Sequence, residues 1–139
     1  MRRSLSLLLL ALAFLVAAPV LAQPAELEVT DQKVGDGAEA KRGMDVTVHY
    51  TGWVFDAAAP DQHGAQVDTS RNGSGPMTFR LGAGEVVRGW DKGIAGMKVG
   101  GQRRLVIPPQ LGYGRRGVKG IVPPDTTLVF EIELLAAKR

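Results

Sequence analysis

Residues 85–96 read Glu-Val-Val-Arg-Gly-Trp-Asp-Lys-Gly-Ile-Ala-Gly and hold the only helical pattern outside the N-terminal segment. Apolar residues recur there at intervals of three and four, at Val86, Val87, Trp90 and Ile94. Charged residues take the opposite face, and Gly93 and Gly96 limit the helix to about three turns. This stretch therefore predicts one short helix.

Alternation of apolar and polar residues predicts strands on both sides of this helix. In the clearest run, Val46, Val48 and Tyr50 share one face, and polar residues that include His49 occupy the other. Further strands are expected at residues 27–34, 77–81, 102–107 and 127–135. Residues 56–66 and 112–120, which are rich in turn-forming residues, are expected to be loops. The order predicts an α+β fold, with an antiparallel sheet wrapped on the helix.

The first 22 residues have the three-part layout of a secretory signal peptide. Arg2 and Arg3 give a charged start, and an apolar run leads to a cleavage site at Val20-Leu21-Ala22. The run is short for a membrane anchor, which needs about 20 residues, and Pro19 interrupts it. We therefore expect residues 1–22 to be removed by either the general or the twin-arginine export route.

The remaining chain is expected to comprise a flexible lead at residues 23–26 and one domain at residues 27–139. It would be exported to the periplasm or the medium, without stable membrane insertion. Loss of Arg2 and Arg3 leaves 15 basic against 14 acidic residues, a net charge of +1. This near-neutral balance argues against a nucleic-acid partner.

The sequence lacks the residue patterns that most kinds of catalytic site require. The chain contains no cysteine, which excludes thiol chemistry and cysteine metal sites. Ser70 and Ser74 lie outside any nucleophile motif, and the spacing of His49 and His63 matches no metal motif. Residues 112–117 spell a dinucleotide glycine pattern, but no strand precedes it and no helix follows it. We expect neither a metal nor a cofactor.

Six short segments occur in an order that closely resembles the FKBP-type peptidyl-prolyl cis-trans isomerases, and together they span about residues 27–135. They are Val48-His49-Tyr50-Thr51-Gly52, Val67-Asp68-Thr69-Ser70-Arg71, Glu85-Val86-Val87-Arg88-Gly89-Trp90, Gly112-Tyr113-Gly114, Gly120-Ile121-Val122-Pro123-Pro124 and Thr127-Leu128-Val129-Phe130. The resemblance implies a curved antiparallel sheet of five or six strands around one short helix. It also implies an apolar pocket that binds proline-containing segments of exported proteins, and macrolides.

By this resemblance, Trp90 forms the pocket floor, and the Tyr113 hydroxyl and a backbone N–H near Ile121 meet substrate carbonyls. Asp68, oriented by Tyr50, lies beside the bound amide, so Asp68, Tyr113 and Tyr50 are the expected catalytic residues. The other substrate-binding residues implied are Val67, Met77, Val86, Val87, Ile121 and Phe130.

Each of these residues also has an ordinary structural interpretation. Trp90, Phe130 and the two valines of the helical stretch could be core residues. Asp68 could cap a turn, and the hydroxyls of Tyr50 and Tyr113 could point to water. The order of all segments together favours the proline-binding pocket.

The sequence departs from the family at several pocket positions. Val67 and Met77 stand where aromatic residues are usual, Gly73 replaces a common Arg, and Val118 replaces a His in the loop. The loop at residues 56–66 is also about seven residues longer than in the smallest family members. We therefore expect modest activity. The alternatives are a chaperone or peptide-binding module with little isomerase activity, and a structural domain of the export system.

We predict that the mature protein begins at Gln23 and is recovered outside the cytoplasmic fraction, because the small residue Ala22 completes a cleavage site. N-terminal sequencing of the expressed protein checks this. Recovery only of chains that start at Met1, in the membrane pellet, would contradict it.

Overall fold

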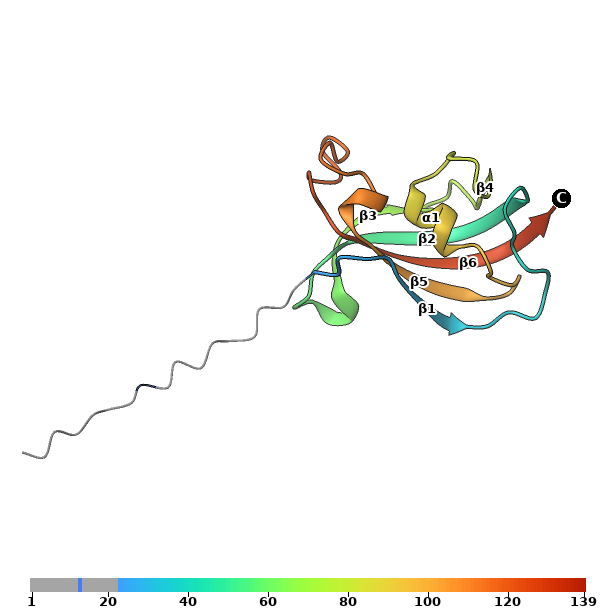
Figure 1. The fold of residues 1–139 in the computed structure, drawn as a ribbon, viewed down its shortest axis with the longest axis horizontal. Coiled ribbons are helices and arrows are strands. Elements are labelled where there is room, and N and C mark those ends of the chain that lie inside the picture. The colour runs from blue at the N-terminus through green and yellow to red at the C-terminus, as the bar shows by residue number, and fades with distance from the viewer. Residues whose placement is uncertain (1–12, 14–22) are drawn as a thin grey trace, which may run out of the picture.

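A computed structural model of the chain describes residue 13 and residues 23–139, so the expected signal peptide lies almost wholly outside the described residues. Residues 23–139 form one six-stranded antiparallel sheet with a single α-helix over one face (Figure 1). The elements are β1 (Glu28–Lys33), β2 (Asp45–Phe55), β3 (His63–Thr69), β4 (Met77–Arg80), α1 (Arg88–Gly93), β5 (Gln102–Ile107) and β6 (Leu128–Lys138). This arrangement confirms the predicted fold class.

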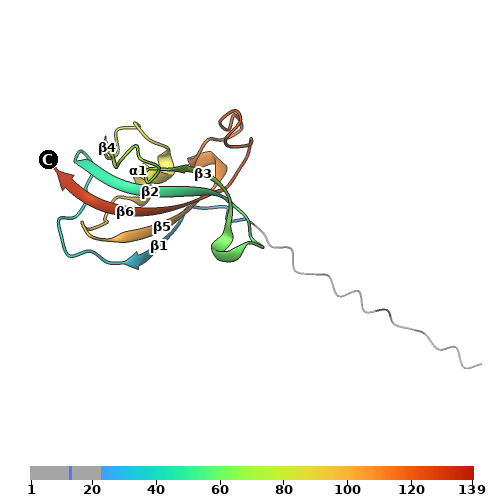
Figure 2. The ribbon, with the colours of Figure 1, turned by 180° about the vertical axis from the view of Figure 1, so that it is seen from behind.

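The long strand β2 organises the sheet, whose order is β1-β5-β6-β2-β3 with β4 also paired to β2. One edge of β2 pairs with β6 from Asp45 to Val54. Its other edge is shared, because β4 pairs with residues 45–48 and β3 with residues 51–55. The sheet curves around α1, as Figures 1 and 2 show from opposite sides. This curvature creates the concave face on which the pocket is built.

The core lies between the concave face and α1, as the alternation in the sequence predicts. Val46 and Val48 are fully buried there, and β6 contributes Leu128, Phe130, Ile132 and Leu134. The opposite face of β6 is partly buried as well. Buried Val129 packs with Phe55 and Val106 in a second, smaller cluster behind the sheet.

The segment at residues 56–66 covers this second cluster, and the prediction that all of it is a loop is wrong. It contains a 3-10 turn at Pro60–Gln62, and β3 begins at His63. The His63 ring stacks on Trp53 with centroids 3.6 Å apart and planes at 4°. Arg104 of β5 adds hydrogen bonds to the Asp61 carbonyl oxygen and the Gln62 side chain, at 2.7 and 2.8 Å. These contacts hold the segment against the sheet.

The helix is shorter than the expected three turns, because α1 has only six residues. Val87 has an extended backbone, with φ −55° and ψ 146°, so the helix cannot begin before Arg88. The Asp91 carboxylate accepts hydrogen bonds from the N–H groups of Gly82 and Gly84, at 2.8 and 3.0 Å. It thereby holds the segment before α1 in a non-helical path. The apolar periodicity at Val86 and Val87 reflects a pocket wall instead of a helical face.

Residues 23–26, expected to be a flexible lead, contact the domain at two points. The Gln23 side chain accepts a hydrogen bond from the buried Thr127 hydroxyl at 2.7 Å. The Gln110 side-chain amide donates to the Ala25 carbonyl oxygen at 2.9 Å. Within the described residues, no helix is long and apolar enough to cross a membrane.

Gly93→Ala should destabilise the protein, because α1 lies directly on β5 at this glycine. A Cβ at position 93 would lie 2.6 Å from a methyl carbon of Leu105, which is fully buried and has no free space to move into. We expect a loss of about 1–3 kcal/mol from overpacking, more than the roughly 1 kcal/mol that alanine gains in helix propensity. Urea melts measure the difference, with exposed Lys92→Ala as the control. Equal stability of Gly93→Ala and the parent would contradict this packing.

Candidate active site

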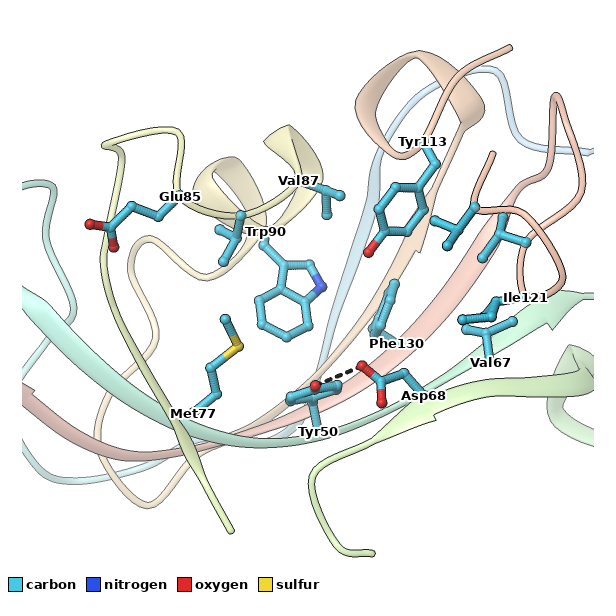
Figure 3. A pocket seen from close by; sticks show the side chains of 13 residues that line it. Tyr50, Val67, Asp68, Met77, Glu85, Val87, Trp90, Tyr113, Ile121 and Phe130 are labelled. Carbon is cyan, nitrogen blue, oxygen red and sulfur yellow. Dashed lines mark hydrogen bonds between the residues drawn. The ribbon is translucent and has the colours of Figure 1, made fainter. Parts of the chain in front are cut away.

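A cavity of about 450 Å³ opens between the concave face of the sheet, the start of α1 and the loop at residues 112–120 (Figure 3). Its lining contains all ten residues that the sequence analysis assigned to a site, although they come from distant parts of the chain. The lining residues are Tyr50, Val67, Asp68, Met77, Glu85, Val86, Val87, Trp90, Tyr113, Val118, Ile121, Val122 and Phe130. The cavity thus brings every expected site residue to one place.

Trp90 forms the floor of this cavity and belongs to the core at the same time. Its ring meets Tyr50 at a centroid distance of 4.8 Å and an interplanar angle of 72°, and Phe130 at 5.3 Å and 89°. Trp90 and Phe130 are only 4% and 3% exposed. Trp90 and Phe130 are therefore core residues that also line the cavity.

The Trp90 indole nitrogen is buried and has no hydrogen-bond partner among the described residues. Figure 3 shows this nitrogen on the side of the ring that faces Phe130. The perpendicular arrangement of the two rings allows the N–H to approach the aromatic face, which is a weak acceptor. The floor thus carries one polar group that no strong acceptor satisfies.

Asp68 contributes a carboxylate to the cavity, and neighbouring strands fix its position. The register of β2 and β3 places Asp68 opposite Gly52, beside Tyr50. The Tyr50 hydroxyl donates to Asp68 Oδ2 at 2.8 Å, and the Thr69 N–H donates to Oδ1 at 2.8 Å. Asp68 forms no ion pair with the described residues, in agreement with Gly73 at the position of a common family Arg. The carboxylate accepts these two hydrogen bonds within the sheet and lines the cavity.

The two tyrosines of the chain are held in their protonated form. Burial, together with the hydrogen bond to Asp68, raises the pKa of Tyr50 to about 12. Burial, followed by the negative charge of Asp68, also raises the pKa of Tyr113. Tyr113 is 40% exposed, and its hydroxyl points into the cavity in Figure 3. Both phenols can therefore donate hydrogen bonds at neutral pH.

The N–H groups of Ile121 and Val122 are not free to bind a substrate carbonyl. The N–H groups of Ile121 and Val122 both donate to the Val118 carbonyl oxygen, at 2.9 and 2.8 Å, and close a tight turn. Val87, by contrast, lines the cavity from an extended segment, and its N–H has no acceptor among the described residues. Val87 thus offers one free backbone donor at the cavity wall.

Three lining residues were absent from the expected site. Glu85 lies at the far side of the cavity from Tyr113, and its carboxylate accepts the Arg80 N–H at 2.7 Å (Figure 3). Val118 was noted only as a departure from the family, and Val122 only as part of an apolar segment. Their positions depend on the turn at residues 118–122, which periodicity does not reveal. Glu85 directly precedes Val86, an expected site residue, and this adjacency was the one feature of the sequence that could have indicated Glu85.

The sequence is similar to proteins of one family. The family model of the FKBP-type peptidyl-prolyl cis-trans isomerases matches residues 36–135. An FK506-binding protein of Neisseria meningitidis serogroup A is 47% identical over 109 residues, which cover 78% of this chain and 94% of that protein. FK506-binding protein 1 of Dictyostelium discoideum is 45% identical over 112 residues, which cover 81% of this chain and 98% of that protein.

Solved structures show the same likeness. The crystal structure of AtFKBP13 matches with a TM-score of 0.71 and 40% identity, over 84% of this chain and 96% of that one. The crystal structure of FkpA from Escherichia coli matches with a TM-score of 0.69 and 39% identity. That match covers 81% of this chain but 48% of the other, so this chain spans about half of the Escherichia coli protein.

Phenolate absorbance should report the cavity directly, because the chain has only two tyrosines and both line it. A raised pKa means that folding favours the neutral phenol. The Tyr50 contribution to stability is therefore complete below the ordinary pKa of 10 and is lost as the pH rises towards 12. Near pH 10 we expect less phenolate in the folded protein than in guanidinium-denatured protein.

Asp68→Asn should increase the folded-state phenolate signal at the same pH, because it removes the carboxylate charge beside both hydroxyls. The exposed control Asp36→Asn should leave the titration unchanged. Superimposable titrations of the folded and denatured parent would show that the tyrosines do not occupy this environment.

Proposed function

Because this chain belongs to the FKBP-type peptidyl-prolyl cis-trans isomerases and shares their activity, we propose that the cavity above Trp90 is where it binds and twists X-Pro amides. The observation that carries this proposal is the aromatic floor, with Tyr50 and Phe130 in edge contact with a buried Trp90. A proline ring is apolar and compact enough for such a floor. The substrates proposed are proline-containing segments of exported proteins during folding.

Catalysis by such a cavity needs no nucleophile. Rotation about the amide faces a barrier of about 18–20 kcal/mol, because the twisted midpoint loses its resonance. The twisted amide is also less zwitterionic than the planar amide, so water stabilises it less well. An apolar aromatic cavity therefore favours the twisted form over the planar one, and this preferential binding lowers the barrier.

Polar groups at the cavity wall would hold the substrate while its amide rotates. The Tyr113 hydroxyl and the unpaired Val87 N–H are donors for carbonyl oxygens on either side of the proline. Asp68, fixed by Tyr50 and Thr69, presents its charge to the amide carbon, which becomes more positive as resonance is lost. Each of these groups acts on a charge or a dipole that changes during the twist.

The export assignment rests on the N-terminal segment and on the need for such an enzyme outside the cytoplasm. Uncatalysed X-Pro isomerisation takes tens to hundreds of seconds, which is slow for a protein that refolds after translocation. The proposed compartment is the periplasm, with the signal peptide at residues 1–22 removed and the domain at residues 27–139 carrying the activity. The family's macrolide ligands are proposed to bind on the same floor.

A second candidate role is peptide holding with slow turnover, favoured by the loss of two aromatic walls. Val67 lies beside Ile121 at one side of the cavity, and Met77 at the other side is 37% exposed (Figure 3). Both leave the bound proline with less apolar contact than a ring would provide. The rate on short peptides, relative to the affinity for them, separates the two roles.

Val67→Phe should raise kcat/KM about fivefold, because a ring at this position adds apolar contact worth on the order of 1 kcal/mol in the twisted state. The measurement is cis-trans exchange of a short X-Pro peptide, with macrolide affinity and the melting temperature recorded beside it. Val29→Phe is the matched control, since Val29 lies on β1 outside the cavity and is 45% exposed.

A lower melting temperature with no gain in rate would mean that the ring overpacks the cavity. If rate, affinity and stability are all unchanged, residue 67 does not contact the substrate. Absence of any catalysis by the parent on short X-Pro peptides would reject the proposed site.

A further inference from the structure

Three cations on the loop at residues 112–120 play no part in the mechanism above. Arg115, Arg116 and Lys119 are all exposed, and none of them forms an ion pair with the described residues. By contrast, Arg71, Arg80 and Arg103 all pair with carboxylates. The loop therefore carries a local excess of positive charge on a protein that is otherwise almost neutral.

This charge lies at the rim of the cavity. The loop places Tyr113, Val118 and Ile121 in the cavity wall. Consecutive Cα atoms are about 3.8 Å apart, so Lys119 lies within about 4 Å of Val118 along the chain, and Arg115 within about 8 Å of Tyr113. A peptide that leaves the cavity across this loop therefore passes near the backbone positions that carry these side chains.

The backbone of the loop is held in one path, so the charges keep their place. The Gly117 N–H donates to the Tyr113 carbonyl oxygen at 3.1 Å, and the Asp125 N–H donates to the Gly114 carbonyl oxygen at 2.9 Å. Gly117 has φ +58°, and a Cβ there would collide with the Val122 carbonyl oxygen. Asp125 is the acidic side chain nearest along this path, and it offsets only part of the charge.

The opposite wall of the cavity has the other sign. Glu85 lies across the cavity from Tyr113 and Ile121 in Figure 3, and its carboxylate is bound by a backbone N–H instead of a cation. An extended peptide that crosses the cavity from Glu85 to the loop would pass the carboxylates of Glu85 and Asp68 before it reaches the three cations of the loop. Such a field distinguishes the two flanks of a substrate.

We propose that Arg115, Arg116 and Lys119 determine substrate specificity, and that the preferred substrates carry carboxylates on the flank of the proline that crosses the loop. This inference rests on the proposed binding of X-Pro segments above Trp90. The cations would act on exposed substrate side chains, so the effect is a modest, salt-sensitive gain in kcat/KM. The same carboxylates on the other flank would face Glu85 and give no gain.

The experiment compares peptides with one central X-Pro bond, in which Gln residues on either flank are replaced in turn by Glu or Lys. Exchange NMR measures the isomerisation rate, so that no coupling protease adds a charge preference of its own. At about 10 mM salt, where screening extends over about 30 Å, we expect each Glu on one flank to raise kcat/KM about two- to fivefold. Lys on that flank should lower it, and about 0.5 M salt should remove both effects.

The triple variant Arg115→Gln, Arg116→Gln, Lys119→Gln should abolish the Glu preference but keep the rate on the Gln peptide. The control Lys33→Gln, Lys138→Gln, Arg139→Gln removes the same charge from exposed positions away from the cavity and should keep the preference. Catalysis of the Gln peptide without any Glu preference, or an equal preference on both flanks, overturns this inference and leaves the proposed function intact. Failure to catalyse any of the peptides rejects both.

Discussion

The enclosure of Trp90 by Tyr50, Phe79 and Phe130 is the constraint on which the rest of the structure depends. The same ring closes the core beneath α1 and forms the floor of the cavity. A floor that is part of the core cannot rearrange when a ligand arrives, so the cavity is largely formed before binding. The buried indole N–H has no hydrogen-bond partner among the described residues, so this arrangement lowers the stability of the fold by the cost of burying an unsatisfied donor.

The residues behind the sheet serve a different purpose from those in front of it. The segment at residues 56–66 buries Phe55, Val106 and Val129 by means of the stack of His63 on Trp53. It thus adds packing to a sheet whose concave face is already committed to the cavity. None of this segment lines the cavity, so its contacts stabilise the back of the sheet.

The sequence predicted those parts of the fold that local patterns determine. Strand β5 was placed at its observed bounds, because Pro108 and Pro109 stop the strand after Ile107. The length of α1 was not predictable, since it depends on Asp91 holding two distant N–H groups. The start of β3 at His63 depends on the stacking of the His63 ring on Trp53, ten residues earlier in the chain. The expected site residues do surround one cavity, but periodicity alone places them in a core; only their joint order pointed to a pocket. The resemblance placed a backbone donor near Ile121. In the structure, the N–H of Ile121 donates to the Val118 carbonyl oxygen within a turn that periodicity does not predict.

Strand β1 forms one edge of the sheet, and all six of its residues are exposed. An exposed edge of this kind can act as a template on which a bound peptide adds a strand. Glu28, Asp31 and Lys33 place charges along the edge, and the pairing with β5 is irregular between Asp31 and Lys33. Charges and bulges of this kind oppose strand addition. The backbone of β1 is therefore a poor template for an added strand, and the side chains of the cavity remain the contacts for a proline-containing peptide.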